Sequence, residues 1–323
     1  MGSVAEIAWS EQIEEGDWIK DGLASPVGST VTSIIPGGFE AYARVLHPAV
    51  LAGPEGDGQA RWAQVAAWSG LELRPNAQFH SVALPPRGPV SDELAACRPP
   101  RKGSLTARDC ITLAARLRPH TDTPDRCWFC LWEGYAWQGV KSDPIPAEIL
   151  DGPRVALPRR DYVLFSGPVE AAAAIDEAAF TPNIWWPSDR AWCVVSAIDL
   201  PWTYIGAAAP VIADLLAGDD LEVLPAEPDD RVSRVESWVV EWAYAGVDEL
   251  LRNGSCRIET PRGAIEAWFE RPGLQTGSLG ITSTTADGRR WSKRTAVEHR
   301  VDQELRRLIS LHLMMHLVDL VEG

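Results

Sequence analysis

The sequence predicts an α+β fold, with a mixed, mostly antiparallel sheet and flanking helices, and it leaves open a division into two lobes. Three observations point to this class. Stretches with strand periodicity alternate with stretches of helical periodicity, Gly and Pro interrupt the first 150 residues at short intervals, and residues 222–236 form an acidic, Pro-containing stretch. We expect a larger α+β region over 1–224, and a smaller one over 225–323 made of a helix, a hairpin and a terminal helix.

The first expected elements are two strands and a helix. Residues 29–35 are rich in β-branched side chains, and residues 39–46 place apolar side chains on one side at period two. Thr106 followed by Asp109 resembles the box that starts a helix, ahead of apolar residues at helical spacing. The sequence therefore predicts strands over 29–35 and 39–46 and a helix over 106–118.

The middle of the chain shows two strand-to-helix units after one long apolar strand. Residues 127–132 form a six-residue apolar run, which predicts a central strand covered on both faces. A strand over 162–165 precedes an alanine-rich helix over 169–179. A strand over 191–200 precedes a helix over 210–216, which begins with Pro and is followed by Gly.

The last hundred residues predict a simpler arrangement. A helix over 236–252 ends at Asn-Gly, and strands over 257–260 and 264–269 flank a Pro-Arg-Gly turn. Thr295 and Glu298 have the spacing of a capping box, which predicts a terminal helix reaching almost to the last residue.

The charge of the chain is strongly acidic. It has 45 Asp and Glu against 30 Lys and Arg in 323 residues, a formal net charge of -15. Such a surface repels phosphate backbones and attracts a basic protein partner. No apolar run reaches the roughly 20 residues of a membrane span, and the first residues lack the pattern of a signal peptide. We expect a cytoplasmic protein that binds neither membrane nor nucleic acid.

Metal-like spacings occur twice, and both are weak. Cys127 and Cys130 follow His120, but on a strand the two thiols point to opposite faces, and no second pair stands nearby. His312 and His316 lie one turn apart on the expected terminal helix, without the Glu of a metalloprotease motif. That helix is apolar nearly all round, which predicts deep packing or a homodimer interface. We expect reduced thiols, no metal and no cofactor.

Tryptophan is abundant, with 15 in the chain. Most lie in runs patterned as core. Trp185 and Trp186 differ, because they are adjacent and precede a Pro in an expected loop. Two consecutive rings in a loop do not easily both face inward, so we expect one of them to line a pocket or a contact surface.

Catalytic motifs are incomplete. The sequence has no Gly-x-Ser-x-Gly, no phosphate-binding loop and no dinucleotide fingerprint. His47, His120, Glu133 and Asp189 are the side chains from which an acid–base site is most readily assembled. Linear order does not establish that they meet, and such residues also serve as caps and ion-pair partners.

Three stretches together resemble a family of uncharacterised bacterial proteins: 36–48, 120–134 and 186–193. The resemblance extends over about residues 30–230 and implies no particular activity. Two hypotheses follow from the residues. The first is a non-catalytic binding protein, similar in role to an immunity protein or an antitoxin, that recognises a basic partner. The alternative is a hydrolase with an acid–base site around His120, Glu133 and Asp189.

Overall fold

The chain forms two compact units, Met1–Val232 and Ser233–Gly323, in the computed structural model. Each unit is described by itself. The structure describes residues 7–26, 28–53, 57–83, 92–136, 149, 151–158, 160–173, 181–232, 246–260, 263–270, 276–285, 288, 290–298, 309, 312, 313 and 316.

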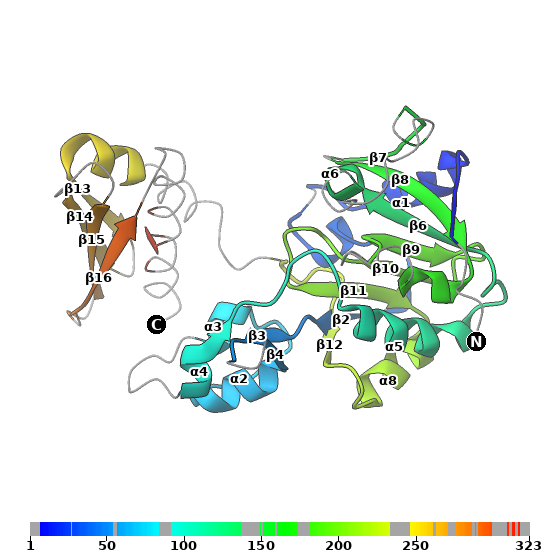
Figure 1. The fold of residues 1–323 in the computed structure, drawn as a ribbon, viewed down its shortest axis with the longest axis horizontal. Coiled ribbons are helices and arrows are strands. Elements are labelled where there is room, and N and C mark those ends of the chain that lie inside the picture. Colours follow the sequence, from blue (N-terminus) through cyan, green and yellow to red (C-terminus); the bar gives the residue numbers. More distant parts are fainter. Residues whose placement is uncertain are drawn as a thin grey trace. The chain divides into compact units, whose positions relative to one another are not determined.

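The first unit is built on a large antiparallel sheet (Figure 1) with the strand order β1-β8-β6-β9-β10-β11-β2-β12, and β7 also pairs with β8. These strands are β1 (Ala8–Trp9), β2 (Ala41–Leu46), β6 (Cys127–Trp132), β7 (Val155–Leu157), β8 (Arg160–Gly167), β9 (Ile184–Pro187), β10 (Trp192–Val195), β11 (Trp202–Ala207) and β12 (Val223–Ala226). A small sheet joins β3 (Ala49–Leu51) to β4 (Gly58–Ala60) and β5 (Cys97–Arg98). The predicted α+β class with mostly antiparallel pairing is confirmed.

Helices pack on both faces of the large sheet. The α-helices are α1 (Asp17–Gly22), α2 (Trp62–Ser69), α3 (Phe79–Ala83), α4 (Asp92–Ala96), α5 (Ala107–Leu117), α6 (Glu133–Ala136) and α8 (Ala209–Ala217). Short 3-10 helices are η1 (Ile13–Gly16), η2 (Val31–Ser33), η3 (Arg118–His120) and η4 (Val169–Ala173). Figure 1 shows α5 and α8 side by side, and their apolar side chains share one core. The predicted helices over 106–118 and 210–216 are confirmed.

Strand β6 divides two hydrophobic cores. Trp128 and Cys130 belong to the core that includes α1 and α2, whereas Cys127 and Phe129 belong to the core under α5 and α8. β6 lies between β8 and β9 in the sheet. The prediction of a central strand covered on both faces is confirmed, and it explains why the run has no polar positions.

The segment 29–35 is not a strand, so that prediction is wrong. Val31–Ser33 forms the 3-10 helix η2. The Ser33 hydroxyl accepts from the backbone N–H of Gly28 and Thr30, each at 2.9 Å, and donates to the Thr30 carbonyl at 2.6 Å. These local hydrogen bonds fold the segment into a turn of 3-10 helix, which outweighs the β-branched composition.

Other predicted boundaries shift. The strand predicted over 191–200 ends at Val195 in β10. The helix predicted over 169–179 begins as the 3-10 helix η4, and its second half lies outside the described residues. Residues 223–232 belong to the first unit, because β12 pairs with β2 and Val31 donates to the Asp230 carbonyl at 3.0 Å. The structure therefore divides the chain after Val232 rather than near 225.

The second unit contains a four-stranded antiparallel sheet in sequence order: β13 (Ser255–Thr260), β14 (Gly263–Glu270), β15 (Thr276–Thr285) and β16 (Arg290–Glu298). The predicted hairpin is confirmed as β13 and β14. Val247, Leu250, Ile309 and Leu313 pack against one face of the sheet.

The predicted capping box at Thr295 and Glu298 is wrong. Both residues lie in β16, where Thr295 is paired with Leu279 of β15. Pairing along nine residues of β16 outweighs a local helix-start signal. The first part of the helix predicted over 236–252 and most of the terminal helix lie outside the described residues.

Candidate functional site

His47 lies at the end of β2 and is 1% exposed. Its Nδ1 is 2.7 Å from the Arg101 carbonyl oxygen, and its Nε2 is 2.9 Å from the Thr203 hydroxyl. A carbonyl only accepts, so Nδ1 carries the proton and Nε2 accepts from Thr203. Burial lowers the pKa of His47 to about 4. The ring is therefore neutral and shielded from solvent, and its two hydrogen bonds hold Arg101 and Thr203 in place.

Asp189 lies beside the residues that follow His120. Its carboxylate accepts from the Thr121 hydroxyl and from the Asp122 N–H, both at 2.7 Å, and from the Ala191 N–H at 3.1 Å. Burial alone raises the pKa of Asp189, but these hydrogen bonds outweigh it and the pKa is lowered. The ionised Asp189 carboxylate therefore holds the loop at residues 121–122 in place. No hydrogen bond in the described structure joins it to the half-buried His120 ring.

Glu133 lies at the opposite end of β6 from Asp189. It begins α6 directly after Trp132, and its carboxylate is 3.8 Å from Arg154 Nε. Asp189 lies beyond the other end, where Ser188 N–H donates to the Arg126 carbonyl just before β6. The five residue steps of β6 span about 17 Å. The structure therefore does not bring the predicted acid–base residues into one site.

Trp185 and Trp186 are both fully buried, so the expectation that one of them lines a surface is wrong. They lie on β9 rather than in a loop. Consecutive strand residues point to opposite faces. Trp185 therefore enters the core under α5 and α8, where its ring contacts Phe129 and Trp192, and Trp186 enters the other core against Trp18.

The thiols are dispersed and buried. Cys127 and Cys130 face different cores, as the strand spacing predicts. All six cysteines of the chain are free. Burial raises the pKa of Cys127 to about 12 and that of Cys130 further above its ordinary value. A thiol that resists ionisation is a poor nucleophile and a poor metal ligand.

His316 also has a structural partner. Its Nδ1 lies 2.9 Å from the Ser283 hydroxyl on β15, and the residue is 6% exposed. Burial lowers its pKa to about 4. His312 is half-buried one turn earlier. Within the described part of the chain, no three His, Cys, Asp or Glu side chains gather as a metal site would require.

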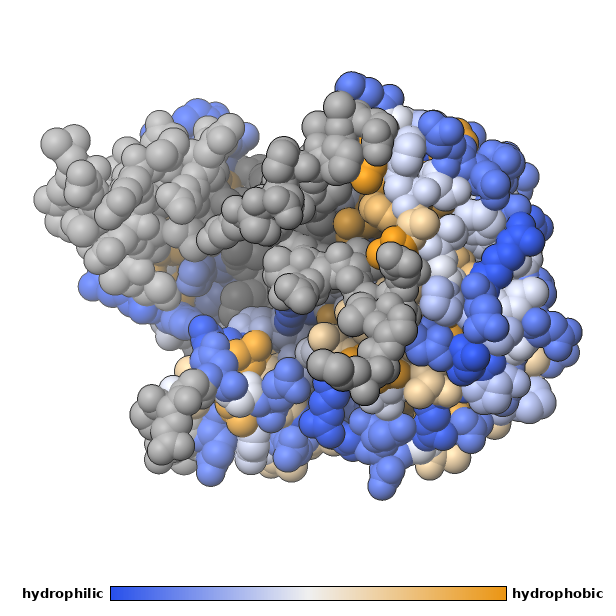
Figure 2. Space-filling model, turned by 45° about the vertical axis from the view of Figure 1, so that its right-hand side comes forward, coloured by the Kyte–Doolittle hydropathy of each residue, from blue (hydrophilic) through white to orange (hydrophobic). Residues whose placement is uncertain are grey.

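The acidity of the chain is concentrated in the first unit. Residues 1–232 contain 32 acidic and 18 basic side chains, a formal net charge of -14, whereas residues 233–323 contain 13 and 12, a net charge of -1. On the face of the first unit seen in Figure 2, hydrophilic residues predominate toward the right-hand edge. Local pairing then decides which of these charges remain available to a partner.

Residues 11–21 of the first unit form what we call the acidic surface. They follow β1 at one edge of the large sheet and include α1. The acidic side chains of this segment are Glu11, Glu14, Glu15, Asp17 and Asp21. Another acidic segment, residues 227–230, follows β12 at the opposite edge of the sheet.

The carboxylates of the acidic surface lack neutralising partners. None of them forms an ion pair within the described residues, and Lys20 is the only basic residue between 11 and 21. Elsewhere in this unit Arg116 pairs with Asp214 and Asp220 at 3.1 and 3.0 Å. The acidic surface thus contributes uncompensated negative charge. Its signal was visible in the sequence as a run of acids over residues 11–21.

A half-buried tryptophan lies within the acidic surface. Trp18 on α1 contacts Trp186 and Phe39 edge-on, with ring centroids 6.0 and 6.4 Å apart, and the Arg190 guanidinium lies 5.4 Å from its ring centroid. Its indole therefore sits at the margin of the core with part of its surface toward solvent. An aromatic ring beside charged groups is a common feature of protein contact surfaces.

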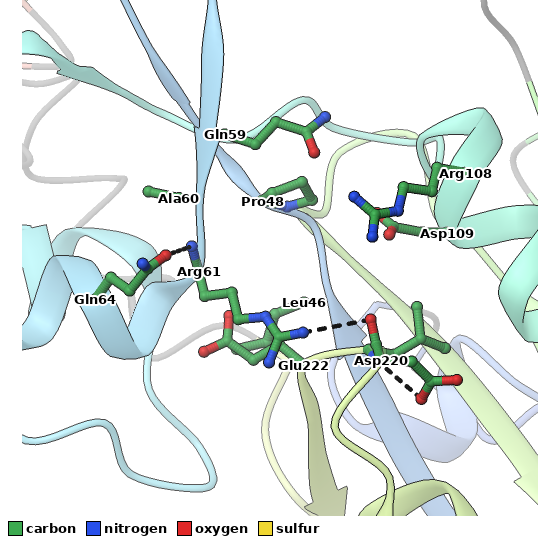
Figure 3. Close-up of a pocket in the computed structure, with 11 residues that line it drawn as sticks. Leu46, Pro48, Gln59, Ala60, Arg61, Gln64, Arg108, Asp109, Asp220 and Glu222 are labelled. Atoms are coloured by element: carbon green, nitrogen blue, oxygen red, sulfur yellow. Dashed lines mark hydrogen bonds between the residues drawn. The ribbon is translucent and has the colours of Figure 1, made fainter.

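A polar pocket of about 200 Å³ lies where α2 and α5 begin. Four parts of the first unit line it, and Figure 3 shows Arg61 and Arg108 entering from opposite sides. The lining residues are Leu46, Pro48, Gln59, Ala60, Arg61, Gln64, Arg108, Asp109, Asp220, Leu221 and Glu222. No local pattern in the sequence indicates this pocket, because its residues are spread over more than 170 positions.

Comparisons of this chain with protein-family models, with curated proteins and with solved structures find no match. In the described residues, no helix is both long enough and apolar enough to cross a membrane.

Proposed function

We propose that this chain is a cytoplasmic, non-catalytic binding protein whose first unit recognises a basic protein through the acidic surface. The observation that carries the proposal is the set of carboxylates on residues 11–21, none of which forms an ion pair within the described residues. Unpaired surface carboxylates attract cations over about 8 Å at physiological salt. Such a field speeds the encounter with a basic partner and orients it.

Trp18 supplies the apolar component of this proposed contact. Charged rims contribute mainly to association rate and specificity, whereas buried aromatic anchors contribute most of the affinity. Trp18 is already held edge-on by Trp186 and Phe39, so a partner that covers it orders little additional side-chain motion. A Lys- or Arg-rich surface with a small apolar recess fits this arrangement.

The positions of the acid–base candidates support the non-catalytic part of the proposal. His47 is buried and neutral, Asp189 fastens a loop, and Glu133 lies at the other end of β6. General acid–base catalysis requires a titrating group within hydrogen-bond reach of the substrate. The six free cysteines support a reducing compartment such as the cytoplasm. A homodimer through the terminal helix stays a prediction, because most of that helix lies outside the described residues.

The test compares two variants of equal net charge. One removes three charges from the acidic surface: Glu14→Gln, Asp17→Asn and Asp21→Asn. The control removes three exposed carboxylates elsewhere in the first unit: Glu72→Gln, Asp122→Asn and Asp151→Asn. Binding of a fluorescein-labelled folded protein with pI above about 9 is measured by anisotropy at low and moderate salt.

We expect the acidic-surface variant to bind about tenfold more weakly than the wild type at low salt, because three surface charge contacts of about 0.5 kcal/mol each are lost. The control should bind within about twofold of the wild type. Equal losses in both variants would mean that net charge alone attracts the probe, and would refute recognition by this surface. Trp18→Ala should weaken binding with little change in its salt dependence.

A further inference from the structure

The geometry points to a second binding site: we infer that the pocket at the start of α2 and α5 holds a small oxyanion, phosphate-like or carboxylate, between Arg61 and Arg108. This site is independent of the acidic surface and of the proposed basic partner. The pocket is too small for a drug-sized ligand, which usually needs 300 Å³ or more, but about 200 Å³ accommodates a group of several heavy atoms.

The carboxylates that line this pocket are already engaged. Glu222 accepts from the backbone N–H of Trp62 at 2.6 Å and of Ala63 at 2.8 Å, and so caps α2. Asp220 is held by Arg116 through contacts of 3.0 and 3.1 Å.

Asp109 accepts from the Thr106 hydroxyl at 2.8 Å within the helix-start box of α5. Burial raises the pKa of Asp109 and of Glu222. Each of these acids therefore has a structural role.

The two arginines retain N–H donors that can meet a ligand. Arg61 Nη2 donates to the backbone carbonyls of Asp219 and Asp220 at 2.5 and 3.4 Å, and its charge also attracts the Asp109 and Glu222 carboxylates. The Arg108 side chain forms no hydrogen bond or ion pair to the described residues. Figure 3 shows both guanidinium groups directed toward the interior of the pocket.

Two guanidinium groups facing one small cavity offer N–H donors that match an oxyanion. The planar fork of Arg presents paired N–H donors at the spacing of carboxylate and phosphate oxygens. Both helices begin at the pocket, and their partial positive charge adds to that of the arginines. Gln59 adds an amide to the lining. A cation has no uncommitted carboxylate here, and an apolar ligand has little apolar wall.

The first unit, which contains the pocket, is acidic overall. A net charge of -14 disfavours non-specific attraction of anions. A saturable response to phosphate would therefore report a local site rather than the general field. Because the Arg108 side chain makes no hydrogen bond to the described residues, its replacement leaves the hydrogen bonds of α5 intact and separates ligand loss from unfolding.

The experiment is isothermal titration calorimetry of the full chain with inorganic phosphate, sulfate or acetate at constant ionic strength. We expect saturable binding of at least one of them, with a Kd near about 1 mM. The preferred anion identifies the source: phosphate or sulfate indicates a phosphoryl-type ligand, and acetate indicates a carboxylate. Arg108→Gln should weaken binding at least about tenfold, the effect of one lost charge-assisted hydrogen bond.

The matched control is Arg74→Gln, which changes the net charge equally but removes an exposed side chain paired with Glu72. It should bind within about twofold of the wild type. Arg61→Gln should behave as Arg108→Gln does, with its folding checked by thermal unfolding. Absence of heat with all three anions up to about 50 mM, or equal binding by wild type and Arg108→Gln, would overturn the assignment.

Discussion

The buried imidazole of His47 predicts a specific loss of stability in mild acid. The unfolded chain takes up a proton on this ring near its ordinary pKa of about 6.5, whereas the folded chain does so only near a pKa of about 4. Above about pH 6.5 the ring is neutral in both states and contributes no pH dependence. Between 6.5 and 4 the unfolded state binds more protons, so stability falls as the pH falls.

The size of this effect follows from the two pKa values. A shift of 2.5 units corresponds to about 3.4 kcal/mol once the pH is below both, and to about 2 kcal/mol at pH 5. His47→Gln removes the titrating group. The Gln amide can replace the hydrogen bond to Thr203 but not the one to the Arg101 carbonyl. Loss of the latter lowers the free energy of unfolding by about 1 kcal/mol at every pH.

The assay is urea unfolding at pH 7.5 and pH 5.0, followed by Trp fluorescence. The first unit contains 11 of the 15 tryptophans, so the signal reports mainly its unfolding. The wild type should be more stable than His47→Gln by about 1 kcal/mol at pH 7.5 and less stable by about 1 kcal/mol at pH 5.0. Thr203→Val is the control, because it removes the hydroxyl partner and retains the ring. Its pH dependence should match the wild type. An unfolding difference between wild type and His47→Gln that is equal at the two pH values would refute the buried neutral ring.

Three further outcomes are expected. Trp185→Ala should lower the free energy of unfolding by about 3–5 kcal/mol and leave binding of the basic probe unchanged, because the ring is wholly internal; weaker probe binding by a folded variant would contradict this. Thr106→Ala should cost about 1 kcal/mol by removing the α5 cap, whereas Thr112→Ala on the exposed side of the helix should cost less than about 0.5 kcal/mol, measured by thermal unfolding. In the native chain a thiol reagent should modify about one cysteine quickly, the half-buried Cys97, and Cys97→Ser should abolish that phase. Rapid modification of several thiols would show that the cores open readily.

The acidic surface and the pocket, for which we propose different ligands, differ in how their charges are paired. At the acidic surface, exposed carboxylates lack partners and a half-buried Trp18 lies among them. In the pocket, the carboxylates of Asp220 and Glu222 accept hydrogen bonds, and the guanidinium groups of Arg61 and Arg108 face the cavity. In both places, the charge that remains available is decided by local pairing rather than by the net charge of -15.

Elements with strong local signals were predictable. The helix α5 follows from its Thr106–Asp109 box and apolar spacing, and the strand β6 follows from a run with no polar position. The prediction of the terminal helix start failed because a local capping signal competed with long-range strand pairing. Thr295 and Glu298 have cap spacing, yet β16 pairs with β15 over its whole length. Sequence alone does not weigh a cap of about 1 kcal/mol against a complete ladder of backbone hydrogen bonds.

What the sequence by itself determined is the α+β class, the acidity, and the inward role of most tryptophans and thiols, because composition and short-range periodicity encode burial. Only the tertiary structure decided which side chains lie close enough together to form a binding site. It placed Trp185 and Trp186 in separate cores, set Glu133 and Asp189 at opposite ends of a strand, and brought Arg61 to face Arg108. The physical reason is that a site is a matter of distance and direction between side chains far apart in the chain, and these are set by sheet order and packing rather than by any local pattern.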